Sequence, residues 1–140
     1  MRMTLAVTTS VLLAMGASGL VAGGANAKPP LREVSEIHDG LLAVGIADEI
    51  RKNCGSISAR MFRAINYVEG LKGRARDLGY TEDEIKAYYK SDVEKARMRA
   101  LGEAYLKANG VSRANPASFC VLGEAEIAKA SLIGKLLRAK

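Results

Sequence analysis

The sequence has few of the residues from which catalytic and metal sites are built. Among 140 residues there is no tryptophan, and there are only one histidine, two cysteines and three prolines. A zinc site takes three or four protein ligands. One histidine beside two cysteines that are predicted below to be bonded to each other cannot supply them. No metal and no cofactor is therefore expected.

The motifs that mark common enzyme classes are missing as well. His38 lies beside Asp39, but no nucleophile is implied near it, and a lone histidine at the start of a helix is usually a surface or capping residue. The glycines fall singly within helical patterns, so no phosphate-binding loop is present. Residues 77–88 loosely match a calcium loop, yet the final ligand position is Tyr88, where a carboxylate is required. We expect no catalytic residue and no enzymatic activity.

The first residues have the layout of a secretory signal peptide. A short basic start is followed by an apolar run over residues 5–22 and by an Ala-Asn-Ala triplet that ends at Ala27. An uncleaved membrane anchor is the alternative, but hydroxyl residues and glycines interrupt the run, and it ends in a cleavage site. The sequence predicts a signal peptide over residues 1–27, cut between Ala27 and Lys28, and no transmembrane segment in the mature protein.

The chain is basic. It has 21 lysine and arginine residues against 15 aspartate and glutamate residues, a formal net charge of +6. Removal of the signal takes away only Arg2 and leaves +5. An exported protein of this charge meets anionic lipid, cell-wall polymer or acidic protein rather than nucleic acid. Many charges alternate along stretches such as residues 94–99, which is typical of a solvated helix face. The candidate contacts to an anionic surface are Arg60, Arg63, Lys72, Arg74 and Arg76.

The two cysteines, Cys54 and Cys120, predict one disulfide bond. An even cysteine count in an exported chain indicates a disulfide, and two cysteines allow a single pairing. Neither belongs to a Cys-x-x-Cys motif, so a redox role is not expected. The bond would close a loop of about 65 residues, for which the chain-entropy treatment gives a stabilisation of roughly 4 kcal/mol.

Hydrophobic periodicity predicts an all-α fold, a small bundle of four or five helices. No stretch shows sustained strand alternation. We expect an extended segment over residues 28–38, which starts with two prolines, and a single helical domain over residues 39–140. The first helix is expected to run from the N-cap Asp39 to about Asn53, with Cys54 on its buried stripe.

The second helix is predicted to start near Ser56 or Ser58 and to end at Gly79. Gly70 and Gly73 weaken its middle by about 1 kcal/mol each relative to alanine. Its arginines are expected to point toward solvent. The apolar stripe expected to face the core consists of Ile57, Met61, Ile65, Val68, Leu71, Ala75 and Leu78.

Helix-start signals place the remaining elements. Thr81 opens a capping box, and the helical pattern continues from there to about Ala108. A second box at Ser91 leaves open whether this segment is one helix or two. The last helix is expected to start at Asn115-Pro116 and to run to about Leu137. Small residues on one of its faces, with Cys120 among them, are expected to pack against the first helix.

Several stretches carry a resemblance to a known family: GLLAV at 40–44, ADEIR at 47–51, ISARM at 57–61, EKARMR at 94–99, GEAYL at 102–106, FC at 119–120, EAEI at 124–127 and IGKLL at 133–137. From Leu31 to Lys140 the chain resembles an uncharacterised family of small exported proteins from alphaproteobacteria. The resemblance implies a Gram-negative envelope location, which is the periplasm. It implies no functional residues.

The leading functional hypothesis is a non-catalytic binding or interaction protein of the periplasm, with an envelope protein or an anionic surface as partner. The second hypothesis is a small acid-stress chaperone. The 15 carboxylates lose their charge between about pH 5 and pH 3 and leave a cationic chain that exposes apolar faces. Two further hypotheses are a binder of anionic surfaces and an enzyme.

Overall fold

The computed structural model describes residues 28–140, and the predicted signal peptide, including Ala27, lies outside the described residues. The elements of the described part are, in chain order, a 3-10 helix η1 (Leu31–Glu33), α1 (Ser35–Asn53), β1 (Ile57–Ala59), α2 (Met61–Asp77), α3 (Glu82–Lys90), α4 (Asp92–Ala108), α5 (Ala117–Ala128), α6 (Leu132–Lys135) and β2 (Leu137–Ala139). The predicted helical bundle with one disulfide is confirmed.

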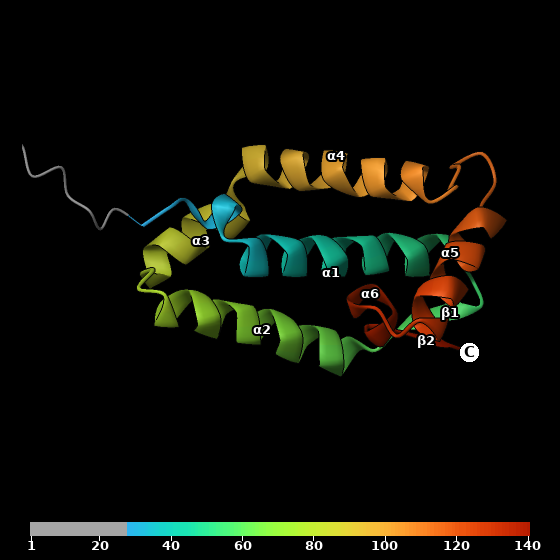
Figure 1. Cartoon of the computed structure of the whole chain (residues 1–140), viewed down its shortest axis with the longest axis horizontal. Helices are drawn as coiled ribbons and strands as arrows, with labels where there is room; N and C mark the ends of the chain where they lie inside the picture. The colour runs from blue at the N-terminus through green and yellow to red at the C-terminus, as the bar shows by residue number, and fades with distance from the viewer. Residues whose placement is uncertain (1–27) are drawn as a thin grey trace, which may run out of the picture.

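α1 is the central element of the bundle. α4 lies along one side of it and α2 along the other (Figure 1). α5, α6 and the two strands gather at the C-terminal end of α1, while η1 and α3 lie at its N-terminal end (Figure 1). No helix in the described residues is both long and apolar enough to cross a membrane.

Two hydrophobic clusters fill this arrangement. The larger one lies where α1 meets α5, α6 and the strands, and it is centred on Ile46, Ile50, Phe119 and Leu137, each at most 2 % exposed. The smaller one joins η1 and the start of α1 to α2 and α3. Its buried members are Leu31, Ile37, Leu71, Ala75, Tyr80 and Ile85.

The close approach of α1 and α5, expected from the small residues of the last helix, is confirmed at Gly123. A Cβ atom added there would lie 2.7 Å from Cγ2 of Ile50 and closer still to Cδ1 of Ile57. Beside this contact Cys54 and Cys120 form the predicted disulfide, with Cα atoms 5.1 Å apart. The bond joins the end of α1 to the first turn of α5.

α1 begins earlier than predicted. Its first residue is Ser35, four positions before the expected N-cap Asp39, and the expectation of an extended segment over residues 28–38 is wrong from Leu31 onward. The reason is burial. Leu31 and Ile37 belong to the smaller cluster, so η1 turns the chain and the helix starts early enough to place both side chains in that cluster.

Two short strands replace parts of the predicted helices. β1 and β2 pair antiparallel, with Ile57 opposite Ala139. Because β1 occupies residues 57–59, the second helix begins only at Met61. The helix predicted to continue to Leu137 ends at Ala128 as α5, and the short α6 follows it. The chain turns there because Ala130 takes a positive φ of 50°. Strands of three residues are too short to show alternation in the sequence.

The helix-start signals in the middle of the chain are confirmed. Thr81 Oγ1 accepts a hydrogen bond from the amide of Glu84, and the Glu84 carboxylate accepts one from the amide of Thr81. Ser91 Oγ accepts from the amide of Glu94 at 3.2 Å and opens α4. The helical segment that follows Thr81 therefore consists of two helices, α3 and α4, separated at Ser91.

Candidate binding site

The apolar stripe predicted for the second helix faces the core along only part of its length. Leu71 is buried against α1, where a Cβ atom added to Gly40 would lie 2.9 Å from its Cδ1 atom. Met61 and Ile65, by contrast, are each 53 % exposed. α2 diverges from α1 toward its N-terminal end, where it joins β1 (Figure 1). At this end the two helices border a pocket.

This pocket is a groove of about 430 Å³. Its walls come from the second half of α1, the first half of α2, the end of β1 and Leu136. The side chains that line it are mostly apolar and include Val44, Ala47, Met61, Ala64, Ile65 and Val68. A smaller apolar pocket of about 200 Å³ shares Val68 with it and is lined by residues of η1, α1, α2 and α3. We call the larger space the α1–α2 groove.

The charged residues that line the α1–α2 groove are engaged in ion pairs. Asp48 lies 2.6 Å from the guanidinium of Arg51 and 2.5 Å from the ammonium of Lys52. Burial raises the pKa of Asp48, but the hydrogen bonds from Lys52 and Arg51 outweigh it and lower the pKa below its ordinary value. Glu69 pairs with Lys72 at 2.8 Å. The floor of the groove thus stays apolar while its border presents both signs of charge.

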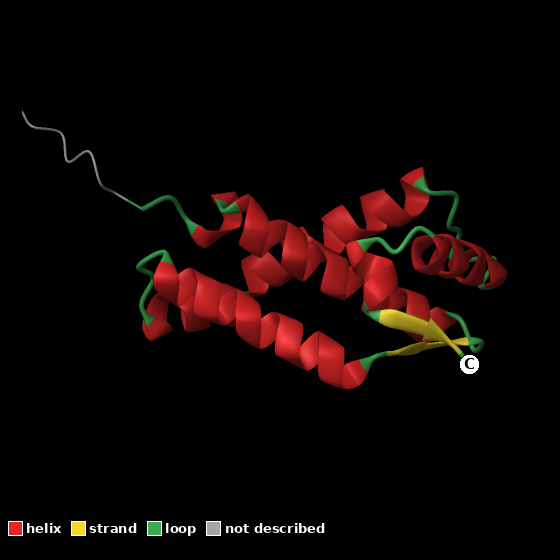
Figure 2. Cartoon of the chain, turned by 60° about the horizontal axis from the view of Figure 1, so that its bottom comes forward, coloured by secondary structure: helices red, strands yellow, loops and turns green. Residues whose placement is uncertain are grey.

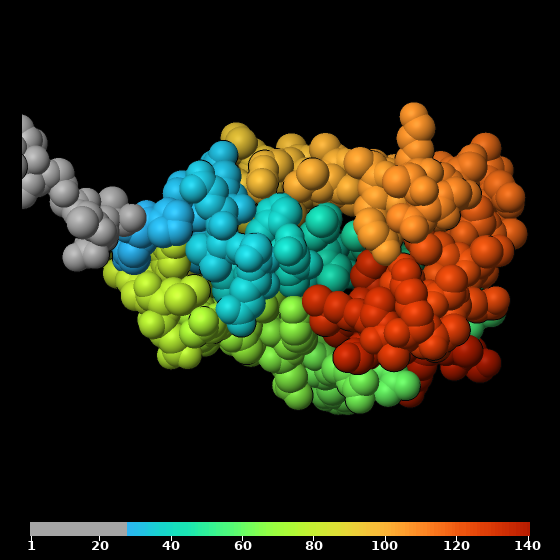
Figure 3. All heavy atoms as spheres, in the orientation of Figure 1, coloured from blue at the N-terminus to red at the C-terminus, as the bar shows by residue number. Residues whose placement is uncertain are grey.

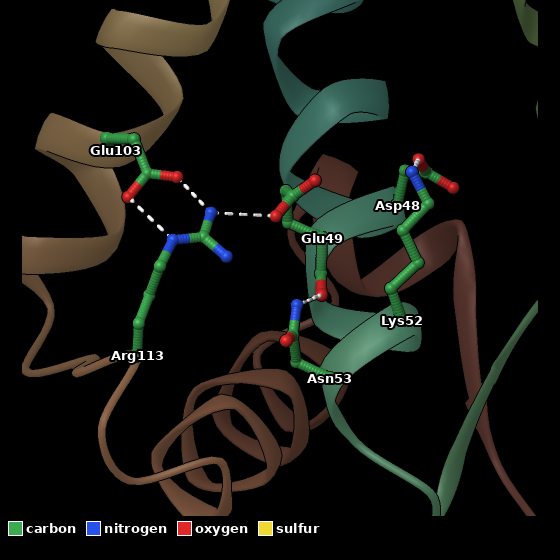
Figure 4. A network of polar contacts seen from close by, with 6 residues as sticks. All are labelled: Asp48, Glu49, Lys52, Asn53, Glu103 and Arg113. Atoms are coloured by element: carbon green, nitrogen blue, oxygen red, sulfur yellow. Dashed lines mark hydrogen bonds and ion pairs between the residues drawn. The ribbon is translucent and has the colours of Figure 1, made fainter.

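A polar network joins α1 to α4 on the opposite side of α1. Arg113, from the loop before α5, reaches between Glu49 of α1 and Glu103 of α4 (Figure 4). Its Nη2 donates to Glu49 at 2.8 Å and its Nε donates to Glu103 at 3.2 Å. Asn53 donates to the carbonyl of Glu49 beside them. Since a cation engages each carboxylate, this network stabilises the packing, and the described residues contain no cluster suited to hold a metal ion.

Three of the five candidate contacts to an anionic surface are neutralised within the molecule. Lys72, Arg74 and Arg76 form ion pairs with acidic side chains. Their partners are Glu69 at 2.8 Å, Glu36 at 2.8 Å and, at shorter range, Glu82. The hydrogen bond from Arg76 lowers the pKa of Glu82.

The other two candidates, Arg60 and Arg63, bind neutral groups. Arg60 Nε donates to the carbonyl of Leu137 at 3.0 Å, and Arg63 Nη1 donates to the carbonyl of Lys135 at 3.2 Å. A carbonyl oxygen does not cancel a positive charge. These two guanidinium groups therefore remain available to an anionic partner.

Strand pairing brings two further cations to the same place. Arg138 lies opposite Ser58 in the ladder and donates to its hydroxyl at 3.1 Å, while Lys135 precedes β2. Phe62, at the start of α2, is 86 % exposed. We call this surface the basic patch, which consists of Arg60, Phe62, Arg63, Lys135 and Arg138. Sequence reasoning missed Lys135 and Arg138, because only the unexpected β1–β2 pairing makes them neighbours of α2.

Two buried carboxylates lie away from both surfaces. Glu126 of α5 accepts from Tyr105 at 2.6 Å, bonds to Ser131 and pairs with Lys129 at 2.9 Å. Glu94 of α4 pairs with Arg32 and, at 3.6 Å, with Arg97. Through Tyr105 and Arg32 these carboxylates join α4 to α5 and to η1.

His38 makes no hydrogen bond to a serine or cysteine side chain within the described residues. Its Nδ1 atom lies 2.9 Å from Oδ1 of Asp39, its neighbour in α1. Both cysteine sulfurs are used in the disulfide. His38 therefore lies in the first turn of α1 and bonds to its neighbour there.

Comparison with known proteins extends over almost all of the described part. Residues 29–138 match the model of a family of unknown function, DUF5333. Neither the curated proteins nor the solved structures give a match. The resemblance to an uncharacterised family is confirmed, while alphaproteobacterial origin and export stay predictions. Because the match covers residues 29–138, the chain belongs to the family DUF5333.

Proposed function

We propose that the protein is a non-catalytic binding protein of the periplasm, and that its α1–α2 groove holds an apolar segment of a partner protein. The observation that carries this proposal is the groove itself. It has about 430 Å³ of open space, lined mostly by aliphatic side chains, between two helices of the bundle. Binding sites are commonly concave, mostly apolar and of this size.

The shape of the groove favours the apolar face of a helix as the occupant. It runs between two helices, and amphipathic helices bind in such grooves through apolar residues spaced three and four apart. Met61 and Ile65 stand half exposed at its edge, so apolar surface continues outside the groove and would be covered by a macromolecule. The flexible thioether of Met61 can repack around different side chains. The pairs Asp48–Arg51 and Glu69–Lys72 can orient a partner of mixed charge.

The periplasmic location is supported by the signal sequence predicted over residues 1–27. The bond between Cys54 and Cys120 agrees with it, because disulfides persist in oxidising compartments and are rare in the cytosol. The ion pairs at the groove support a role without catalysis, since they engage the charged side chains that line it.

The test is site-specific photo-crosslinking in living cells from position 65, with position 93 as the control. Ile65 borders the groove, whereas Val93 is an equally apolar, 71 % exposed side chain of α4. We expect one discrete partner, crosslinked through an apolar segment, from position 65 alone. Ala64→Trp, which fills the groove, should abolish the crosslink, and Ala96→Trp on the exposed face of α4 should not. Turnover of an envelope substrate that a single substitution abolishes would contradict the proposal.

The buried carboxylate of Glu126 favours an acid-stress chaperone as a second candidate. Glu126 accepts a hydrogen bond from Tyr105 of α4 and pairs with Lys129, and its pKa is lowered, so its protonation in acid would weaken the contact between α4 and α5. Loosened helices would expose the apolar clusters to unfolded client proteins. The crosslinking experiment separates the candidates, because a chaperone gives many unrelated partners that are captured only in acid. Failure to suppress client aggregation at low pH would dismiss it.

A further inference from the structure

The basic patch lies outside the groove and has a different character. Phe62 is not among the side chains that line the α1–α2 groove, and it is 86 % exposed. Single exposed apolar side chains are common on proteins. Here, however, the exposed ring lies between Arg60 and Arg63 in the sequence, and neither these arginines nor Lys135 and Arg138 pair with a carboxylate in the described structure. An exposed aromatic ring and uncompensated basic groups thus occur together at the start of α2.

Side-chain hydrogen bonds bring the start of α2 together with the chain around β2, although the two are distant in the sequence. Arg60 and Arg63 reach the carbonyls of residues 137 and 135, and Arg138 reaches Ser58. Figures 1 and 2 show the start of α2, both strands and the C-terminal residues together at one end of the molecule. In the space-filling view, which has the orientation of Figure 1, α2 lies at the lower edge of the molecule (Figure 3). All five residues of the basic patch are exposed, so the patch is accessible from outside the bundle.

We propose that the basic patch binds the surface of an anionic lipid bilayer. Phe62 lies at the boundary between headgroups and acyl chains, and the four cations contact lipid phosphates. This combination of basic side chains with an exposed aromatic residue is the one that peripheral proteins use at membrane interfaces. Charge complementarity selects the occupant, because guanidinium groups that already use one donor for a carbonyl still present several donors to a phosphate.

The same features argue against an acidic protein as the occupant. A protein partner would need a pocket to cover Phe62, whereas a bilayer accepts a protruding ring without a preformed site. The proposal does not depend on the groove, since Phe62, Arg63 and Arg138 do not line it. If both proposals hold, a segment bound in the groove lies beside the membrane, because Leu136 and Met61 border the groove next to the patch.

Sedimentation with phosphatidylcholine vesicles, with and without phosphatidylglycerol, tests the electrostatic part. Each cation near an anionic surface changes affinity by about fivefold. The variant Arg63→Gln/Lys135→Gln/Arg138→Gln should therefore lose about a hundredfold in affinity for the anionic vesicles. The control variant Lys86→Gln/Lys90→Gln/Lys107→Gln removes the same charge from exposed positions on α3 and α4 and should lose little. Equal losses in the two variants would overturn the proposal.

Arg63 also supports the chain before β2, so unfolding curves of each variant are recorded. If the triple variant is destabilised, Lys135→Gln/Arg138→Gln serves instead, with an expected loss of about 25-fold. An unchanged affinity in this folded pair would equally overturn the assignment.

A tryptophan at position 62 tests the insertion. The chain has no tryptophan, so Phe62→Trp introduces a single indole whose emission can be followed. Its emission should shift to the blue on addition of phosphatidylglycerol vesicles, and the emission of Val93→Trp, an exposed position on α4, should not. Soluble polyglutamate should cause no shift at either position. Binding to polyglutamate as tight as to vesicles, with no shift at position 62, would assign the patch to an acidic protein.

Discussion

The hydroxyl group of Tyr105 in α4 donates a 2.6 Å hydrogen bond to Oε1 of Glu126 in α5, and Glu126 is fully buried. Burial raises the pKa of this carboxyl group, but hydrogen bonds from Ser131, Tyr105 and Lys129 together outweigh it and lower the pKa. Burial, together with the hydrogen bond to Glu126 and the charge of Glu126, raises the pKa of Tyr105 to about 12. Glu126 is thus held in its ionised form at the junction of α4, α5 and the turn before α6.

Replacement of Glu126 should make the protein less stable and less sensitive to acid. A carboxylate whose pKa falls on folding stabilises the folded state above its ordinary pKa of 4.5, and this contribution is lost as the pH falls through the folded-state pKa. We expect Glu126→Gln to lower the free energy of unfolding at neutral pH by about 1–3 kcal/mol. Below pH 4.5 its difference from the native protein should shrink.

Urea denaturation at neutral and acid pH measures both effects. Glu124→Gln is the matched control, because Glu124 is exposed on the same helix two residues away. An identical pH dependence in the native protein and in Glu126→Gln would show that another group carries the acid sensitivity.

Two glycine substitutions should act in opposite directions. At Gly123 the added methyl group would lie 2.7 Å from Ile50 and closer still to Ile57, so Gly123→Ala should cost about 1–3 kcal/mol through overpacking. At Gly45 nothing lies within 4 Å of an added Cβ, and Gly45→Ala should stabilise α1 by up to about 1 kcal/mol through helix propensity. Thermal unfolding compares the two, and a Gly123→Ala protein as stable as the native one would show that α5 can withdraw from α1.

Loss of the disulfide should destabilise the fold without changing it. Cys54 and Cys120 are 66 positions apart, and opening a loop of this length costs roughly 4 kcal/mol in the chain-entropy treatment. We expect Cys54→Ala/Cys120→Ala to lower the free energy of unfolding by that amount while the helical circular dichroism spectrum is retained. A similar denaturation midpoint for the oxidised and reduced native protein would refute this expectation.

Processing of the N-terminus is open to a direct measurement. If the protein is exported as the sequence predicts, its intact mass after isolation from the cell envelope corresponds to a chain that starts at Lys28. Ala27→Asp places a charge at the cleavage site and should leave the precursor uncut. A native protein that retains residues 1–27 would contradict the predicted signal peptide.

Local signals in the sequence were sufficient for several parts of the fold. The capping box at Thr81 and the serine cap at Ser91 act within one helical turn, so their residues show them directly. The pairing of Cys54 with Cys120 followed from the cysteine count, and the small residue at Gly123 indicated a close helix contact.

Features that depend on distant segments were not predictable in the same way. Periodicity showed that Met61 and Ile65 share a helix face with Leu71, but not that α1 covers Leu71 and leaves the other two exposed. Nor could it show that β2 returns to β1 and places Arg138 beside the start of α2. The groove and the basic patch both arise from such long-range placement, which is why neither could be derived from the sequence alone.

The pairing of the chain's distant segments also has a kinetic consequence. Arg138 and Ser58 are 80 positions apart. The larger hydrophobic cluster contains their neighbours Leu137 and Ile57, so it is complete only when these two distant segments have met. The entropy of loop closure has to be spent before burial compensates for it, and proteins with such contacts fold slowly. A nascent chain of this topology stays unfolded for longer than a bundle with only local contacts. If the chain is exported, as residues 1–27 predict, slow folding keeps it in the unfolded form that threads through a translocation channel.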